Sequence, residues 1–481
     1  MLKVYNTLAK KKEAFKTASR GKVKMYCCGI TPYDESHLGH ARCYITWDMV
    51  KRYLSYSGFA VEHVQNFTDV DDKIIERARQ KGMPPAELAE KFTRQYFEEF
   101  DALNVLRAGA YPKATENIKQ VIELIALLEK RGFAYENGGD VFFQVSKFAG
   151  YGKLSGQGIE QLISGKRVEA NPLKRSPEDF ALWKASKPGE PSWDSPWGKG
   201  RPGWHIECSA MGMKYLGETF DLHCGGQDLI FPHHENEIAQ SEAATGKHPF
   251  AKYWLHNGFI TVNKEKMAKS LGNFTTLRAA MEKYSPNAIR YFMLSTHYRA
   301  PIDFSPTALA QATESVGKLE SAIERLGKAA AEPVAKRGQN AQDTKPGAEL
   351  EKITAAFAKA MDDDFNTPAA FASLFELRGY AFAKLEQAQA GDENARGQAN
   401  LAARKLEELF GVLGFKINAN PKAGIEGIDE AEILEKIRQR EEARKAGDYS
   451  KADAIRKELA EKGIVLEDAK GGAKTGWRYA K

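Results

Sequence analysis

The spacing of apolar residues near the N-terminus predicts two strands joined by a helix. Apolar side chains alternate from Val23 to Cys27, as in a half-buried strand that ends before Gly29. After His40, apolar residues recur with helical spacing at positions 45, 49, 50, 53 and 54, and Gly58 is a suitable stop. Residues 61–67 form the second predicted strand. This order predicts an α/β fold with a parallel sheet of the nucleotide-binding type.

The rest of the chain divides into segments of different pattern. Residues 113–165 are helical at first and then mixed, and residues 187–203, rich in Pro, Gly and Trp, predict an ordered irregular loop. From Pro306 the pattern is mostly helical, with breaks of linker composition at residues 332–347 and 417–427. The last piece starts as a charged helix and ends in basic, Gly-rich sequence. We expect boundaries that give segments 1–112, 113–203, 204–255, 256–305, 306–416 and 428–481.

Composition narrows the class of protein. The 481 residues are 42% hydrophobic and 28% charged, which is typical of a globular chain with about two to four domains. The formal charge of +6 permits nucleic-acid binding only if the basic groups cluster. We find no signal peptide and no apolar run that could span a membrane. Five cysteines, an odd and sparse set, predict free thiols in a reducing compartment, so we expect a cytoplasmic protein.

The tetrapeptide His37-Leu38-Gly39-His40 lies where the first predicted strand gives way to the helix. A helix N-terminus carries unpaired N–H groups and a partial positive charge, so it attracts phosphate. Two histidines there can donate to phosphate oxygens, and Gly39 lets a flat ring approach closely. The arrangement suits ATP, although a chance tetrapeptide at a helix start would have the same form.

A second segment, Lys266-Met267-Ala268-Lys269-Ser270, follows a short predicted strand at residues 260–262. Lysine is a mobile point charge on a flexible stem, so this loop could close over a triphosphate and neutralise the charge of departing pyrophosphate. A solvent-exposed lysine loop is the plainer interpretation of this segment taken alone.

Four residues could hold a metal. His233 and Glu237 are four apart in a predicted helix that begins near Pro232, so they share one face. Cysteine, histidine and glutamate are all zinc ligands. Cys28 and Cys208 are candidates, but 180 residues separate them and spacing cannot bring them together. Adjacent residues of a strand point in opposite directions, so only one of Cys27 and Cys28 can be a ligand.

The histidine and lysine segments together resemble the two signatures of class I aminoacyl-tRNA synthetases, with Ala268 where that class commonly has Ser. Longer segments, in family order from Met1 nearly to the C-terminus, resemble the cysteinyl-tRNA synthetase family. They are MYCCGITPYD, NFTDVDDKII, GRPGWHIECSAM, DLHCGGQDLIFPHHENEIAQ, EKMAKSLGNF and AMDDDFNTPAA.

The resemblance implies an architecture for the predicted segments. A Rossmann-like parallel-sheet catalytic domain has halves at 1–112 and 204–255, with an inserted connective domain at 113–203. A stem-contact region at 256–305, a helical bundle at 306–416 and a small C-terminal anticodon-binding domain at 428–481 follow.

The resemblance also implies roles for single residues. In that family two cysteines, a histidine and a glutamate hold one zinc ion per subunit, and they fall on Cys28, Cys208, His233 and Glu237. The second signature lysine, which contacts ATP, falls on Lys269. The substrate would lie against Gly29, Thr68, Trp204, His223 and Asp228, and candidate tRNA contacts are Arg440, Arg444, Arg456 and Trp477. Cys224 is expected to be an inert side chain and Cys43 a core residue.

The reaction implied joins cysteine to tRNA(Cys) through an adenylate, with ATP expected as its Mg²⁺ complex and a monomer as the working unit. His37, His40, Lys266 and Lys269 would act on the phosphates, and no side-chain nucleophile is needed. Shape alone separates cysteine from serine by only about 1–3 kcal/mol. Zinc offers a chemical test instead, because a coordinated thiol loses its proton and binds as a soft thiolate.

Three alternatives stay open from the sequence. A ligase joining cysteine to an amino sugar would share these motifs but would lack the roughly 180 residues that follow Ala300. A zinc-stabilised RNA-binding protein would not need the histidine and lysine signatures. An added persulfide-forming activity with pyridoxal phosphate would use a lysine pair, and only Lys73 of that pair is present because Glu76 replaces the other.

Overall fold

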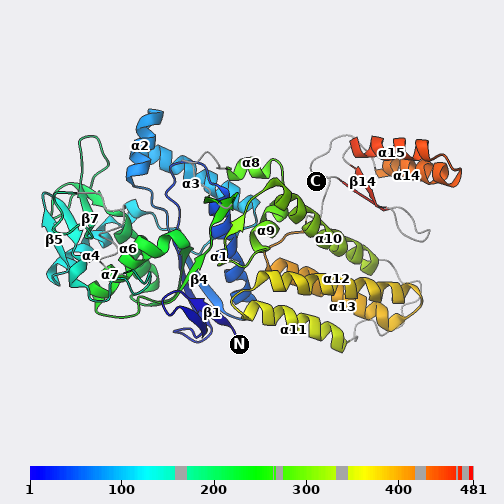
Figure 1. The fold of residues 1–481 in the computed structure, drawn as a ribbon, viewed down its shortest axis with the longest axis horizontal. Coiled ribbons are helices and arrows are strands. Elements are labelled where there is room, and N and C mark those ends of the chain that lie inside the picture. The colour runs from blue at the N-terminus through cyan, green and yellow to red at the C-terminus, as the bar shows by residue number, and fades with distance from the viewer. Residues whose placement is uncertain are drawn as a thin grey trace. The chain divides into compact units, whose positions relative to one another are not determined.

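A computed structural model describes residues 1–157, 171–263, 265–266, 275–331, 345–417, 430–461, 464–467 and 476–479. The chain forms two compact units, Met1–Phe415 and Lys416–Lys481. The first unit contains the parallel sheet, an inserted antiparallel sheet and a set of long helices (Figure 1). No helix of the described residues is long and apolar enough to cross a lipid bilayer.

The central sheet has four parallel strands in the order β10-β9-β3-β4. Their bounds are β3 (Lys22–Cys27), β4 (Ala60–Gln65), β9 (Phe220–Gly226) and β10 (Ala251–Asn257). Helix α1 (Leu38–Tyr56) joins β3 to β4, so the predicted strand–helix–strand unit is confirmed. After β3 the chain continues to β4 at one edge of the sheet, and after β9 it continues to β10 at the opposite edge. The carboxyl ends of β3 and β9 are therefore a topological switch point, where α/β sheets bind ligands.

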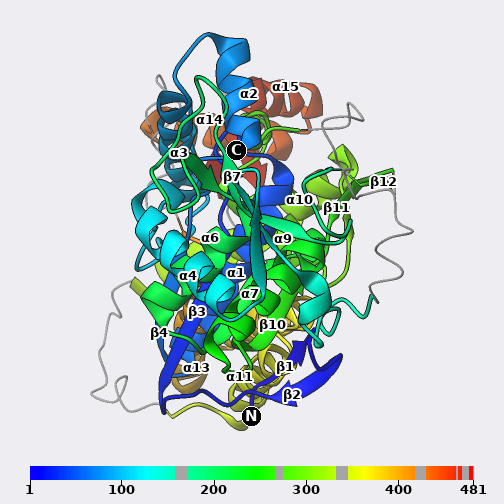
Figure 2. The same cartoon turned by 90° about the vertical axis from the view of Figure 1, so that its left-hand side faces the viewer.

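The remaining elements of the first half frame this sheet. A hairpin of β1 (Lys3–Asn6) and β2 (Lys11–Ala14) lies on the far side of the unit from α2 (Asp72–Lys81) and α3 (Pro85–Ala102) (Figures 1 and 2). The predicted helical and then mixed segment is η1 (Ala114–Asn117), α4 (Ile118–Lys130), β5 (Ala134–Asn137), β6 (Asp140–Phe143) and η2 (Val145–Lys147). Strands β7 (Phe180–Ala185) and β8 (Gly200–Pro202) complete an antiparallel sheet of order β5-β6-β7-β8.

The second half of the unit returns to the sheet and then becomes helical. Helix α6 (Trp204–Leu216) precedes β9, and η3 (Gln227–Leu229), η4 (Ile230–His234) and α7 (Glu235–Thr245) follow it. After β10 come β11 (Ile260–Val262), β12 (Glu265–Lys266), α8 (Leu277–Met281), α9 (Pro286–Leu294) and β13 (Ile302–Asp303). The bundle is α10 (Pro306–Ala331), α11 (Ala348–Asp362), α12 (Thr367–Gln389) and α13 (Glu393–Val412), starting at Pro306 as predicted.

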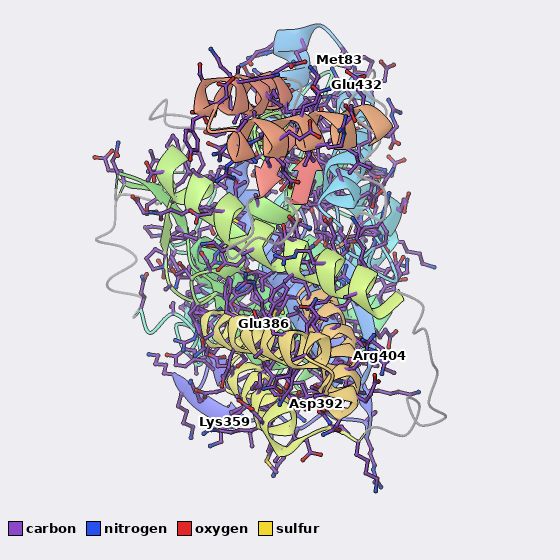
Figure 3. The ribbon with its side chains drawn as sticks, turned by 90° about the vertical axis from the view of Figure 1, so that its right-hand side faces the viewer. Met83, Lys359, Glu386, Asp392, Arg404 and Glu432 are labelled. Carbon is purple, nitrogen blue, oxygen red and sulfur yellow. The ribbon has the colours of Figure 1, made fainter. Side chains whose placement is uncertain are left out.

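The bundle helices show the expected division between an apolar and a charged face. Leu350, Ile353 and Phe357 of α11 are buried at helical spacing. Charged side chains such as Lys359 and Arg404 lie exposed on the outside (Figure 3). The predicted breaks at 332–347 and 417–427 fall mostly outside the described residues.

A buried ion pair fixes the long helix α1 in place. The Arg290 guanidinium of α9 donates to Asp48 of α1 at 2.7 Å and to the Leu103 carbonyl at 2.9 Å. Both charged side chains are essentially inaccessible to solvent. Because an unpaired buried charge is costly, this contact locks the position of the helix whose first turn carries His37 and His40.

The second unit is a small α+β unit. Helices α14 (Glu430–Lys445) and α15 (Tyr449–Glu461) precede the antiparallel strands β14 (Ile464–Glu467) and β15 (Gly476–Tyr479), a strand pair that the charge pattern did not predict. Its core is Ile433, Ile437, Ile455, Leu459, Ile464 and Leu466. Arg440 follows Ile433 and Ile437 on the same helix face and is 3% exposed, so its interpretation as a surface contact was wrong. Arg444 and Arg456 are exposed, and the Trp477 side chain lies outside the described residues.

Candidate metal and nucleotide site

The structure brings Cys28, Cys208, His233 and Glu237 together. Their ligand atoms all lie within 4.8 Å of one another, and all four residues are buried. Cys28 follows the last residue of β3, Cys208 lies in α6, and the other two lie at the start of the helical segment after β9. His233 and Glu237 share one face as predicted, with Nε2 and Oε1 3.0 Å apart.

The separations that involve sulfur fit one tetrahedral zinc ion. With zinc bonds of about 2.3 Å to sulfur and about 2.1 Å to nitrogen or oxygen, a tetrahedron has edges of about 3.8 Å between sulfurs and about 3.6 Å from sulfur to oxygen. The two thiol sulfurs lie 3.9 Å apart, and Cys28 Sγ lies 3.6 Å from Glu237 Oε1. His233 Nε2 and Glu237 Oε1, 3.0 Å apart, are closer than the edge of about 3.4 Å expected between nitrogen and oxygen. The donor set therefore fits zinc in its chemistry and in the two separations that involve sulfur.

Charge within the cluster also favours a cation. The hydrogen bond from Cys28 lowers the pKa of Cys208 to about 6, although burial opposes the shift. Burial would raise the pKa of Glu237, but His223 and His233 outweigh it and lower that pKa to about 2. Cys208 and Glu237 are thus anionic at neutral pH. Burial and the neighbouring Cys208 thiol raise the pKa of Cys28. Burial alone would lower the pKa of His233, but the neighbouring Cys208 and Glu237 raise it to about 10.

A shell of histidines surrounds the four residues. His223, expected against the substrate, belongs to it, and the sequence predicted no role for the others. His205 Nδ1 lies 2.9 Å from His233 Nδ1, which leaves His233 Nε2 facing the cluster. His223 Nε2 lies 2.9 Å from Glu237 Oε2 and holds that carboxylate from the other side. His234 Nδ1 in turn lies 2.8 Å from His256 Nε2. The sequence signals for this shell were the doublet at 233–234 and His223, and the structure places His223 against the Glu237 carboxylate.

A second combination of ligands shares two residues with the first. Cys28, His223, His234 and Glu237 also have ligand atoms within 4.8 Å of one another. Cys28 Sγ lies 3.3 Å from His234 Nε2. This combination has one thiol instead of two, so with its ligands deprotonated it would carry one negative charge fewer toward a metal.

The other cysteines are outside both combinations. Cys27 and Cys224 face each other across the β3–β9 ladder, on the side of the sheet opposite to Tyr26 and His223. Both are buried, and burial raises the pKa of each thiol. Cys43, expected in the core, is instead partly exposed, and its sulfur accepts a hydrogen bond from Trp47 Nε1 at 3.2 Å. All five cysteines are free thiols.

The histidine motif forms the first turn of α1, as predicted. His37 is the N-cap, its Nδ1 accepts from the His40 backbone N–H at 3.3 Å, and the two rings stack with centroids 3.7 Å apart. A Cβ on Gly39 would lie 2.8 Å from the His37 ring. The absence of a side chain at Gly39 therefore makes room for the His37 ring in this structure. Tyr44, four residues after His40 on the same helix, donates to the Cys28 carbonyl at 3.3 Å, which joins α1 to the backbone of one cluster residue.

The chain after the lysine segment returns to the histidine motif. Leu277 N–H donates to the Ser36 carbonyl at 2.8 Å, and His37 pairs with Thr276 in an isolated β-bridge. The backbone of Lys266 belongs to β12 and pairs with Thr261. The Lys266 side chain and all of Lys269 lie outside the described residues.

The predicted substrate residues lie around the same edge of the sheet. Gly29 N–H donates to Asn66 Oδ1 at 2.9 Å, and a Cβ there would lie 1.5 Å from the Asn66 carbonyl oxygen. Thr68 is buried and its N–H donates to the Ile30 carbonyl at 3.1 Å. Trp204 is 39% exposed, and its ring lies 4.4 Å from that of His233. Asp228 lies in η3, the short helix directly before η4, and His233 belongs to η4.

Comparison with known proteins agrees with this geometry. Residues 14–314 match the tRNA synthetases class I (C) catalytic domain, residues 356–418 the DALR domain, and residues 431–478 the cysteinyl-tRNA ligase anticodon binding domain. The chain is 48% identical to the cysteine--tRNA ligase of Syntrophobacter fumaroxidans over 99% of both chains. It is 49% identical to that of Heliobacterium modesticaldum over 100% of both chains.

Solved structures share the fold. Mycobacterium tuberculosis methionyl-tRNA synthetase in complex with methionyl-adenylate superposes with a TM-score of 0.62 at 17% identity, covering 82% of this chain and 91% of that one. The Agrobacterium radiobacter K84 leucyl enzyme, solved as a ternary complex, gives 0.59 at 12% identity, covering 96% of this chain and 97% of that one. With a class I catalytic domain and relatives this similar over its whole length, the chain belongs to the cysteinyl-tRNA synthetase family.

Proposed function

We propose that this cysteine--tRNA ligase activates cysteine with ATP, transfers it to the 3′ end of tRNA(Cys), and selects the thiol with one zinc ion per subunit. The observation that carries the selection is the buried Cys28, Cys208, His233 and Glu237 cluster at the carboxyl end of β3. It adjoins the helix start that bears His37 and His40, so an amino acid held there would lie beside the nucleotide motif.

The four cluster residues would hold the zinc ion, and His205 and His223 would orient two of them. Bound zinc would supply a soft Lewis acid that favours the cysteine sulfur as a thiolate over a serine hydroxyl. Thr68 and Asp228 would hold the substrate amino group or the ribose. Trp204, packed on His233, would close the small pocket around the side chain.

The phosphate chemistry would fall to the two signature segments. His37 and His40 cap each other in this structure, so ATP binding would replace their mutual hydrogen bonds by donation to phosphate oxygens. Lys266 and Lys269 would neutralise charge as pyrophosphate, expected with Mg²⁺, departs. The adenylate then needs only positioning against the tRNA ribose hydroxyl, without an enzyme nucleophile.

The second unit supports tRNA as the acceptor. It matches an anticodon-binding domain, which a ligase acting on an amino sugar would not need. The catalytic-domain match over residues 14–314, with its histidine and lysine signatures, argues against a non-catalytic zinc protein. Its exposed Arg444 and Arg456 are candidate phosphate contacts. Five free thiols support a reducing compartment, and we propose that the enzyme works in the cytoplasm as a monomer.

Amino-acid-dependent ATP–pyrophosphate exchange tests the proposal. Cysteine should give rapid exchange and serine almost none, and transfer should label tRNA(Cys) but no amino sugar. Equal exchange with both amino acids would refute selection by zinc.

One substitution separates the two ligand combinations. Cys208→Ser should lower zinc content and weaken cysteine binding, because Cys208 belongs only to the first combination. Cys224→Ser is the matched control, a buried thiol outside both combinations, and should keep its zinc. Full zinc occupancy in Cys208→Ser would favour the combination with His223 and His234.

A further inference from the structure

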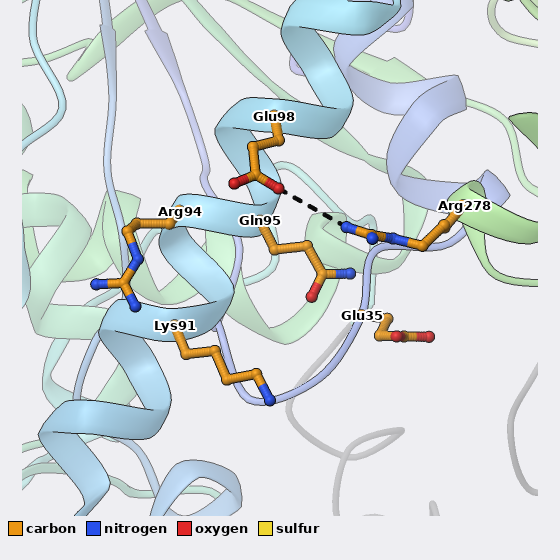
Figure 4. Close-up of a pocket in the computed structure, with 6 residues that line it drawn as sticks. All are labelled: Glu35, Lys91, Arg94, Gln95, Glu98 and Arg278. Carbon is orange, nitrogen blue, oxygen red and sulfur yellow. Dashed lines mark ion pairs between the residues drawn. The ribbon is translucent and has the colours of Figure 1, made fainter.

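A polar pocket lies outside the site described so far, on the outer face of α3. Its cavity volume is about 330 Å³, and the start of α8 forms its other wall (Figure 4). It is lined by Glu35, Lys91, Arg94, Gln95, Glu98 and Arg278. Each of these six side chains is charged or an amide, so among the described residues the lining is polar and suits a charged group better than a nucleotide base or an aliphatic ligand.

The cations of the pocket are available to a ligand. Lys91 and Arg94 lie three residues apart on one face of α3 and are both exposed. Neither has a carboxylate within 4.0 Å among the described residues. Arg278 has only loose pairs, with its Nη2 3.7 Å from Glu98 and its Nε 3.8 Å from Glu99. The pair with Glu98 is long and exposed on both sides, so it contributes little and a better anion can replace it. The pair with Glu99 is partly buried, because that carboxylate is only 2% exposed.

The carboxylates of the pocket limit what it can bind. Glu35 and Glu98 offset two of the three positive charges, so the lining carries a net charge of about +1. Glu98 is 71% exposed and lies opposite Arg278, as Figure 4 shows. A single phosphate group matches this balance, whereas the several charges of a free triphosphate exceed it.

The pocket lies next to the histidine motif that is expected to bind ATP. Glu35 lies two residues before His37, and Arg278 belongs to the helix capped by Thr276, which bridges to His37. Under the proposed function the 3′ end of the tRNA must reach this region to accept the aminoacyl group. The adjoining outer face of α3 is therefore a surface that the neighbouring tRNA backbone would pass.

We propose that Lys91, Arg94 and Arg278 bind a backbone phosphate of the tRNA acceptor arm, a role that rests on the proposed function. Cationic side chains that contact phosphates position nucleic acid without reading its sequence. The pocket would then set where the acceptor arm lies while the signature motifs act on ATP. Glu98 would disfavour RNA binding until Arg278 turns from it to the phosphate.

The test compares a double variant with a matched control. Lys91→Ala with Arg94→Ala should raise the KM for tRNA(Cys) by about tenfold, and should lower the slope of log KM against log salt by about 1–2. Cysteine-dependent ATP–pyrophosphate exchange, which needs no tRNA, should stay within about twofold of the wild type. Arg20→Ala with Lys22→Ala removes the same two charges at the amino end of β3, the opposite edge of the sheet, and should change neither measurement.

A third variant tests whether removing a negative charge from the pocket strengthens tRNA binding. Glu98→Gln keeps the shape of the side chain and removes the charge opposite Arg278, so it should lower the KM for tRNA(Cys) by about two- to threefold. Unchanged charging by the double variant would overturn the proposal. A raised KM for ATP in exchange would assign the pocket to the nucleotide instead. Absence of exchange in the wild-type enzyme would count against the proposed function and not against this pocket.

Discussion

Zinc binding to the metal-free enzyme should release about two protons at pH 7.5. Metal ligands must bind deprotonated, so each ligand that carries a proton beforehand must lose it. Burial raises the pKa of Cys28, so this thiol contributes about one proton. His233, with its pKa raised to about 10, contributes about one more. Cys208, with a pKa of about 6, contributes about 0.03, and Glu237, with a pKa of about 2, contributes none.

The same count fixes the pH dependence of zinc affinity. Affinity should rise with pH, because two protons must leave before the metal binds, and the rise should be about 100-fold per pH unit between pH 7 and 8.5. That change corresponds to about 2.7 kcal/mol per unit. As the pH falls toward 6 the Cys208 thiol becomes protonated as well, so proton release should rise above two.

Calorimetric titration in buffers of different ionisation enthalpy measures the released protons directly. Competition with a chromophoric chelator at several pH values measures the affinity. His233→Gln should release about one proton fewer than the wild type. If zinc instead used His223 and His234, neutral His234 would release nothing and His233 would keep its proton, so the count would fall by about one. A wild-type count near one, or near zero, would refute the assignment of His233.

Further predictions concern the scaffold. Gly29→Ala should destabilise the fold by about 1–3 kcal/mol and reduce exchange, because its Cβ would meet the Asn66 carbonyl oxygen; an unchanged melting temperature would contradict this. Arg290→Met should lower the free energy of unfolding in urea by about 3–5 kcal/mol, since Asp48 loses a fully buried partner; a loss below about 1 kcal/mol would show that water or Arg52 replaces it. Removing residues 416–481 should abolish tRNA charging and leave cysteine-dependent exchange nearly intact, and loss of both activities would show that the units depend on each other.

Local features of the fold were predictable because they depend on neighbours in sequence. Alternation marked β3, helical spacing marked α1, and the interval of four placed His233 and Glu237 on one face. The alternation of a strand also separated Cys28, which joins the cluster, from Cys27, which faces Cys224 across the ladder.

Features that depend on distant contacts were not predictable from spacing. Cys208 reaches Cys28 because β9 pairs with β3, an adjacency that no local pattern encodes, and only the family resemblance supplied it. The histidine shell depends also on the pairing of β9 with β10, since His223 lies on β9 and His256 on β10. Arg440 was misjudged because a long side chain at a charged position can still lie on the buried face of its helix.

The pocket on α3 likewise depends on contacts between residues far apart in the sequence. Lys91 and Arg94 belong to a helix with many charged residues and carry no motif. Their proximity to Arg278 arises from the contact between the α1 start and the chain leading into α8. The phosphate-binding role proposed for this surface therefore depends on the tertiary fold.

The central claim is that a metal held by Cys28, Cys208, His233 and Glu237 binds the substrate thiol. Optical titration of the cobalt-substituted enzyme tests it most directly, because thiolate-to-cobalt charge transfer reports each sulfur bound to the metal. Cysteine should increase this absorption to saturation at one equivalent per subunit, and serine should leave it unchanged. A spectrum that does not change with cysteine, or changes equally with serine, would contradict the claim.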